Sequence, residues 1–145
     1  MDYIKEAMKT NNPDIAGIKT RLHSDKVVEL LHSFMGMSTE ANELLDNLKA
    51  HLIYGKGLDI DNIHEELGDC MWFIALACDT LDISLEEIME MNIRKLKKRY
   101  PKEFSSYDAL NRDTKKELEA IKDIQKLNDL KKKVKEKGFS IAGLV

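Results

Sequence analysis

Residues 44–61 read LLDNLKAHLIYGKGLDID, a stretch that predicts two antiparallel helices joined by a short turn. Its first half carries an apolar stripe at helical spacing, made of Leu44, Leu45, Leu48, Leu52 and Ile53. The motif Tyr54-Gly55-Lys56-Gly57 is typical of a helix end, and Asp59 or Asp61 can cap the helix that follows. A helix that runs out to about Tyr54 and one that returns from about Asp59 form an antiparallel hairpin.

Two acidic pairs flank this turn, Glu40 with Glu43 and Glu66 with Asp69, each with its members three residues apart. That spacing puts two carboxylates on one side of a helix. Because a helix rises about 1.5 Å per residue, the two arms have comparable length and the pairs can lie at similar depth. Four carboxylates that meet repel one another and therefore need cations. Oxygen ligands suit Mg²⁺ or Mn²⁺ better than Zn²⁺ or Cu²⁺.

Residues 70–78, CMWFIALAC, are apolar throughout. A helix that is apolar on all sides is normally buried, so we expect a central core helix with Trp72 inside. The run is too short to span a bilayer. Gly68, just before it, favours close helix packing, with room for a ligand as the alternative. Cys70 and Cys78 lie about 12 Å apart by helical rise, too far to form a disulfide with each other.

Helical spacing also covers the residues before the hairpin. A short amphipathic piece ends at the break Asn11-Asn12-Pro13, and apolar residues then recur from about Asp14 to Phe34, with an interruption near His23-Ser24. Gly36 and Ser38 are expected to mark a turn and a cap before the first acidic pair.

Two further helices are expected after the hairpin. Ser84-Leu85-Glu86-Glu87 is a capping box that begins a helix, and Tyr100-Pro101 ends it. Residues through 111 are expected to be irregular, and a last helix spans Asp113 to Lys137, with Gly138 as its stop. Its apolar stripe is Leu118, Ile121, Ile124, Leu127, Leu130 and Val134.

Three blocks of the sequence together resemble the MazG-type all-α nucleotide pyrophosphohydrolases, relatives of phosphoribosyl-ATP pyrophosphohydrolase and the dimeric dUTPases. The blocks are TEANEL at 39–44, EELGD at 65–69, and NIRKL at 92–96 leading to RYP at 99–101. They stand in the family's order and cover about half of the chain. Between the first two glutamates, where the family often has glycine, this chain has Ala41-Asn42, which touches no ligand position.

The resemblance implies an all-α helical bundle with a central antiparallel hairpin, formed by residues 1–110, and an extra C-terminal helix in residues 111–145. It implies a metal-dependent nucleoside triphosphate pyrophosphohydrolase that cleaves between the α and β phosphates and releases a nucleoside monophosphate and pyrophosphate. Its four carboxylates would hold Mg²⁺, with Mn²⁺ as a substitute, and would carry the catalysis: Glu40, Glu43, Glu66 and Asp69. The residues that face the phosphates or sugar would be Asn92, Lys95 and Arg99. Relatives usually assemble, so we expect a homodimer or homotetramer.

Two other functional classes stay open. A non-catalytic helical regulator would bind nucleotide or metal without turnover, and a helical assembly module would carry the acidic pairs as solvated charges. Glu29-Leu30-Leu31-His32 has the Glu-x-x-His spacing of di-iron bundles, but that site needs two such motifs. The resemblance favours the pyrophosphohydrolase over these classes, because all four carboxylates and all three expected phosphate contacts, Asn92, Lys95 and Arg99, are present in this sequence.

The composition indicates which classes of partner the protein is expected to lack. The chain has 145 residues, 43% of them hydrophobic, and a net charge of −3. This length is typical of one domain with a real core. The small negative charge gives no general attraction to nucleic acid, so we expect none as a partner. Without a signal peptide, lipidation motif or transmembrane stretch, we expect a cytoplasmic protein with no membrane partner.

Overall fold

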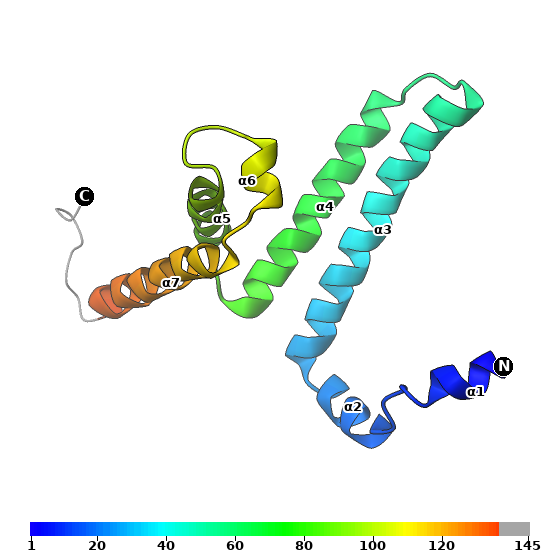
Figure 1. Ribbon diagram of the computed structural model, residues 1–145, viewed down its shortest axis with the longest axis horizontal. Helices are drawn as coiled ribbons and strands as arrows, with labels where there is room; N and C mark the ends of the chain where they lie inside the picture. Colours follow the sequence, from blue (N-terminus) through cyan, green and yellow to red (C-terminus); the bar gives the residue numbers. More distant parts are fainter. Residues whose placement is uncertain (137–145) are drawn as a thin grey trace. The chain divides into compact units, whose positions relative to one another are not determined.

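In a computed structural model of the protein, all regular elements of residues 1–136 are helices (Figure 1). The structure describes the backbone of these residues and their side chains, apart from those of residues 124, 127, 131, 132 and 134–136. The chain forms two compact units, Met1–Asp82 and Ile83–Val145, and each is described by itself. The prediction of an all-α protein is confirmed.

The first unit is built on a long helical hairpin. Two short helices, α1 (Tyr3–Met8) and α2 (Ile15–Leu22), lead into α3 (Asp25–Tyr54), which packs along α4 (Ile60–Leu81) (Figure 1). Gly55 follows α3 with a φ of 67°, a left-handed conformation that suits glycine. The side chain of Asp59 accepts a hydrogen bond from the backbone N–H of Asn62 at 3.1 Å. The predicted hairpin is therefore confirmed, and Asp59 rather than Asp61 caps its second helix.

The expected turn at Gly36 is wrong, because α3 continues through this residue without a break. Gly36 is buried, and a Cβ atom placed on it would lie 2.2 Å from a ring carbon of Phe73 on α4. Ser33, one turn earlier, is completely buried, and its hydroxyl donates to the Glu29 carbonyl oxygen at 2.9 Å. Small side chains thus let the two helices approach closely, and Gly36 is a packing residue.

The expectation that α4 is a core helix on all sides is also wrong for this chain. Its buried residues are Glu66, Ala77 and Cys78, whereas Met71 is 60% exposed and Trp72 56% exposed. A hairpin of two helices covers only one side of each helix, so the remaining apolar side of α4 stays open. At Gly68 an added Cβ meets nothing within 4 Å, so within the described residues of the first unit tight helix packing does not explain this glycine.

The second unit contains α5 (Leu85–Arg99), α6 (Ser106–Leu110) and α7 (Thr114–Glu136). The predicted capping box of α5 is present at Ser84 and Glu87. The short helix α6 was not expected; it begins where Ser105 Oγ accepts a hydrogen bond from the Asp108 backbone N–H at 3.0 Å. The predicted stop at Gly138 lies outside the described residues.

Helix α7 packs against α5. Among its described side chains Glu117 and Ala120 are buried and Ile121 is half-buried, while Leu118 is 50% exposed and Leu130 59% exposed; the side chains of Ile124, Leu127 and Val134 lie outside the described residues. The buried Glu117, near the start of α7, forms an ion pair with Arg99 of α5. Within the described part, the helices contain no stretch that is both long and apolar enough to cross a membrane.

The two helical glycines of the hairpin predict opposite effects of the same substitution. Gly36→Ala places a methyl group into the Phe73 ring, so we expect the free energy of unfolding to fall by about 1–3 kcal/mol. Gly68→Ala meets open space and gains helix propensity, so we expect a rise of up to about 1 kcal/mol. Urea unfolding followed by circular dichroism measures both changes. Equal effects of the two substitutions would contradict the close contact at Gly36.

Candidate metal site

Three of the predicted carboxylates meet between α3 and α4. Glu40 and Glu43 come from α3 and Glu66 from α4, and one oxygen of each lies within 4.8 Å of the other two. Glu66 is only 5% exposed, Glu40 is half-buried and Glu43 is exposed. Asp69 lies one turn further along α4, is exposed, and is not part of this group. We call Glu40, Glu43 and Glu66 the carboxylate cluster.

A chain of amide hydrogen bonds holds Glu66 in place. Asn47 Nδ2 on α3 donates to the Asp59 carbonyl oxygen at 2.9 Å and to Asn62 Oδ1 at 2.8 Å. Asn62 Nδ2 in turn donates to Glu66 Oε1 at 2.8 Å. Sequence analysis missed both asparagines, although each stands four residues from a cluster glutamate, on the side of the turn. These bonds connect the two helices and orient the buried carboxylate.

Burial, followed by the adjacent Glu40 carboxyl group, raises the pKa of Glu66 from 4.5 to about 7. The negative charge of Glu43 acts in the same direction, and the hydrogen bond from Asn62 opposes it. Among the residues that the structure describes, no Lys or Arg forms an ion pair with the cluster. Near neutral pH the cluster thus shares a proton that a divalent cation can replace. Its all-oxygen ligands fit Mg²⁺ or Mn²⁺.

The residues expected on the phosphate side lie on α5, in the second unit. Asn92 is exposed and Lys95 is half-buried. Arg99 ends the helix, and its guanidinium binds Glu117 of α7 through two hydrogen bonds, Nε to Oε1 at 2.9 Å and Nη2 to Oε2 at 2.7 Å. Arg112 binds the same carboxylate, with Nη2 at 2.8 Å from Oε2.

This ion cluster is the main polar contact between α5 and α7. Glu117 is 4% exposed, and the hydrogen bonds from Arg99 and then Arg112 hold the pKa of its carboxyl group far below the usual range. The same contacts raise the pKa of Arg99. Glu117 lies eighteen residues after Arg99, so no local sequence pattern connects the two. We call Arg99, Arg112 and Glu117 the arginine clamp.

The Glu-x-x-His motif does not form a metal site in the described part of the chain. The ring of His32 packs edge-on against Phe73, with centroids 5.6 Å apart, and lies 6.3 Å from Trp72. Glu29 accepts a hydrogen bond from the Thr80 hydroxyl at 3.3 Å. Glu29 and His32 therefore form contacts between α3 and α4, and these contacts do not support the di-iron alternative.

The raised pKa of Glu66 predicts a pH dependence of stability in metal-free protein. Between pH 4.5 and about 7 the folded protein keeps a proton that the unfolded chain has released, so stability falls as the pH rises through this range. We expect the melting temperature in EDTA to decrease across this range and Glu66→Gln to flatten the decrease. Thermal melts at a series of pH values measure both. An equally steep decrease in Glu66→Gln would contradict the assignment.

The arginine clamp predicts that Glu117→Gln lowers the melting temperature by several degrees, because two guanidinium groups lose their shared counter-charge. Glu119→Gln is the matched control, since it removes the same charge from an exposed position on the same helix. Differential scanning calorimetry compares the two variants. If both melt like the unaltered protein, the clamp does not stabilise the contact between α5 and α7.

Comparison with known proteins connects this site to a family. Residues 32–104 match the MazG nucleotide pyrophosphohydrolase domain. The "Gene 37 protein" of Mycobacterium phage L5 is 32% identical over 79 residues, which cover 52% of this chain and 69% of that protein. No solved structure matches the chain. The matched residues include the carboxylate cluster and α5 but end before α7.

Proposed function

Because this chain belongs to the family of MazG nucleotide pyrophosphohydrolase domains, we propose that it hydrolyses a nucleoside triphosphate between the α and β phosphates. The products are a nucleoside monophosphate and pyrophosphate, and the role is control or cleaning of the nucleotide pool. The convergence of three carboxylates within 4.8 Å, one of them buried, is the observation that supports this activity. Asp69 completes the proposed ligand set, because it lies on α4 one turn from Glu66.

We propose Mg²⁺ as the ion, with Mn²⁺ as a substitute. When bound, the ion would neutralise negative charge on the phosphates and lower the pKa of a water molecule, which makes that water a better nucleophile. Glu66 gives up its proton on loading and stays oriented by Asn62. Glu40, half-buried beside it, is the group that we propose accepts the proton of the attacking water. The water oxygen forms a bond to the α phosphorus, and the bond from this phosphorus to the bridging oxygen breaks as pyrophosphate leaves.

Asn92 and Lys95 are the proposed contacts to the phosphates or sugar, since they lie three residues apart on one face of α5. Arg99 stays in this set with a restriction. Two of its five N–H donors already bind Glu117, so fewer of them are left for a phosphate oxygen. We take residues 1–110 as the catalytic domain and 111–145 as a helical extension that the arginine clamp attaches to α5.

Release of pyrophosphate from a panel of ribo- and deoxynucleoside triphosphates with Mg²⁺ tests this function. We expect turnover of at least one triphosphate and a loss of about 100-fold or more in Glu40→Gln and in Glu66→Gln, since even outer-sphere partners of metal ligands cost 10–100-fold. Glu65→Gln, an exposed neighbour, is the matched control and should keep its activity.

The outcomes separate the functional classes. Thermal stabilisation by nucleotide and Mg²⁺ without turnover would replace the enzyme with a non-catalytic regulator. An absence of both turnover and stabilisation would overturn the proposed site.

We also propose that a second copy of the chain covers the open side of the hairpin, giving a homodimer or homotetramer. Leu67, Met71 and Trp72 are 49%, 60% and 56% exposed on adjacent turns of α4. On α3, Leu45 and Leu52 are 62% and 67% exposed. Large apolar side chains exposed in such number on one hairpin are typical of subunit interfaces.

Sedimentation velocity of Met71→Lys tests the assembly. A lysine within the apolar contact should shift the protein to a smaller species, because it buries an unpaired charge. Met89→Lys introduces the same change at a 59% exposed methionine of α5 and serves as the control. A monomeric unaltered protein, or an unchanged assembly in Met71→Lys, would contradict the proposed interface.

A further inference from the structure

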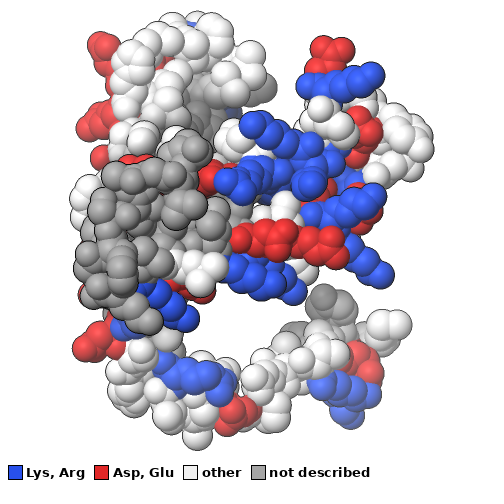
Figure 2. Space-filling view, turned by 90° about the vertical axis from the view of Figure 1, so that its left-hand side faces the viewer, with Lys and Arg blue, Asp and Glu red and all other residues white. Residues whose placement is uncertain are grey.

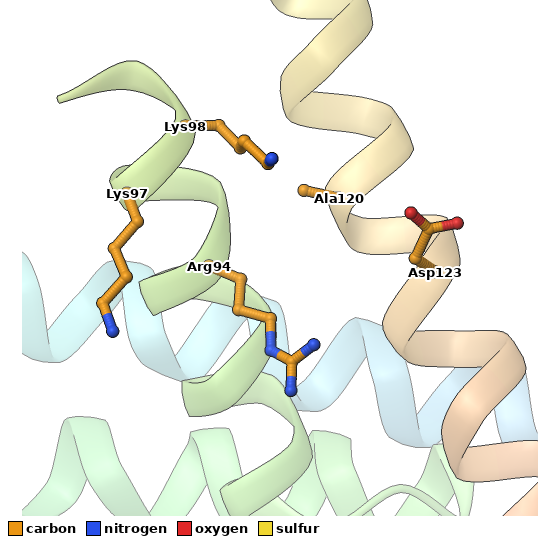
Figure 3. Close-up of a pocket in the computed structure, with 5 residues that line it drawn as sticks. All are labelled: Arg94, Lys97, Lys98, Ala120 and Asp123. Carbon is orange, nitrogen blue, oxygen red and sulfur yellow. The ribbon is translucent and has the colours of Figure 1, made fainter. Parts of the chain in front are cut away.

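A groove of about 410 Å³ lies between α5 and α7 in the second unit (Figure 3). Its α5 wall carries the cations Arg94, Lys97 and Lys98, and its α7 wall carries Ala120 and Asp123. In Figure 3 the side chains of Arg94 and Lys98 extend from α5 toward α7, and Lys97 extends along α5. We call this feature the basic groove.

The charges of the basic groove are unbalanced. Arg94 forms an ion pair with Glu90, one turn earlier on α5. No carboxylate of the described residues lies within ion-pair distance of Lys97 or Lys98. Because their positions follow Arg94 by three and four residues, all three cations share one side of α5. Lys97 and Lys98 are therefore the two cations of the groove without an ion-pair partner among the described residues, and Asp123 is the one negative charge on the opposite wall.

The walls of the groove are held together by the arginine clamp. Glu117, Ala120 and Asp123 follow one another at three-residue intervals along one side of α7. The buried carboxylate of Glu117 binds Arg99, the residue that follows Lys98 on α5. Ala120, 7% exposed, stands between Glu117 and Asp123 in this row and lines the groove. A site whose walls are already fixed loses less conformational freedom when a ligand binds.

We propose that the basic groove binds the phosphate chain of a polyphosphate anion, through residues that do not belong to the carboxylate cluster. Lys and Arg are the side chains that bind phosphate oxygens best. The volume lies within the range of small-molecule sites, about 300–1,000 Å³. Ala120 and Asp123 lie beyond residues 32–104, so the groove includes residues outside the matched domain.

The mixed surface charge favours a small anion over a nucleic acid. A nucleic-acid strand needs a basic track that follows many phosphates. On the face shown in Figure 2, basic side chains lie beside acidic ones and form no uninterrupted basic track. Asp123 also stands against the cations inside the groove. A chain of two or three phosphates needs only a local excess of cations, which the groove provides.

Calorimetric titration of the full chain in EDTA tests the proposal. Without a divalent cation the carboxylate cluster repels phosphates, so binding does not depend on the proposed hydrolysis, and the variants below distinguish the basic groove from Lys95 and Arg99. The probes are tripolyphosphate, ATP and orthophosphate at low and high salt. We expect tripolyphosphate to bind more tightly than orthophosphate and its affinity to fall with salt. ATP that binds like tripolyphosphate indicates recognition of the phosphate chain alone, and tighter binding of ATP indicates a nucleoside contact.

Two variants and a control make the test specific. The double variant Arg94→Gln/Lys98→Gln should weaken tripolyphosphate binding by about tenfold or more, because it removes charge-assisted contacts to the phosphates. Lys115→Gln with Lys122→Gln removes the same charge from exposed positions of α7 and should leave binding unchanged. Asp123→Asn should strengthen binding several-fold by removing the opposing charge, and this gain cannot result from misfolding.

Three results would overturn the proposal. They are no binding of tripolyphosphate in EDTA, equal losses in the groove and control variants, or weaker binding in Asp123→Asn. Binding of a single-stranded RNA oligonucleotide more tightly than tripolyphosphate would also replace the small anion with a macromolecule. A protein that hydrolyses triphosphates but fails these tests keeps its proposed function without the groove.

Discussion

The carboxylate of Glu66 lies almost completely buried between α3 and α4, beside two other carboxylates. Burying a charge without a partner is costly, so burial raises the pKa of the group to about 7, and the group keeps a proton below that pH or takes a cation. The rest of the hairpin serves this placement. Asn62 orients the carboxylate, Asn47 connects Asn62 to α3, and Asp59 begins α4 at the correct register.

Close approach of the two helices makes the burial possible. Small residues are buried on both helices, Ser33 and Gly36 on α3 and Ala77 and Cys78 on α4, and the Phe73 ring lies directly against Gly36. Because the interior of the hairpin is made of few and small residues, large apolar side chains remain exposed on both helices. A hairpin with so small an interior depends on further packing, which is the physical reason to expect a second copy of the chain.

Local signals predicted the hairpin and the start of α5 well, since a left-handed glycine, a side-chain cap and a capping box depend on a few neighbouring residues. Contacts between distant residues were not predictable in this way. Gly36 has the same local pattern as a helix break, and only Phe73, on the neighbouring helix, shows that it is a packing residue. In the sequence, Glu117 resembles any exposed glutamate of a helix, and only the structure shows that Arg99 binds its carboxylate. The exposure of Trp72 depends on what packs against α4, and the sequence of one chain does not specify this.

The central claim is that three carboxylates from two helices form a site for a divalent cation. Anomalous X-ray scattering from crystals soaked in Mn²⁺ tests it most directly, because the signal locates the ion without reference to any activity. The account predicts a manganese peak within coordination distance of oxygens from Glu40, Glu43 and Glu66. Crystals that bind Mn²⁺ elsewhere, with these three carboxylates left without an ion, would contradict it.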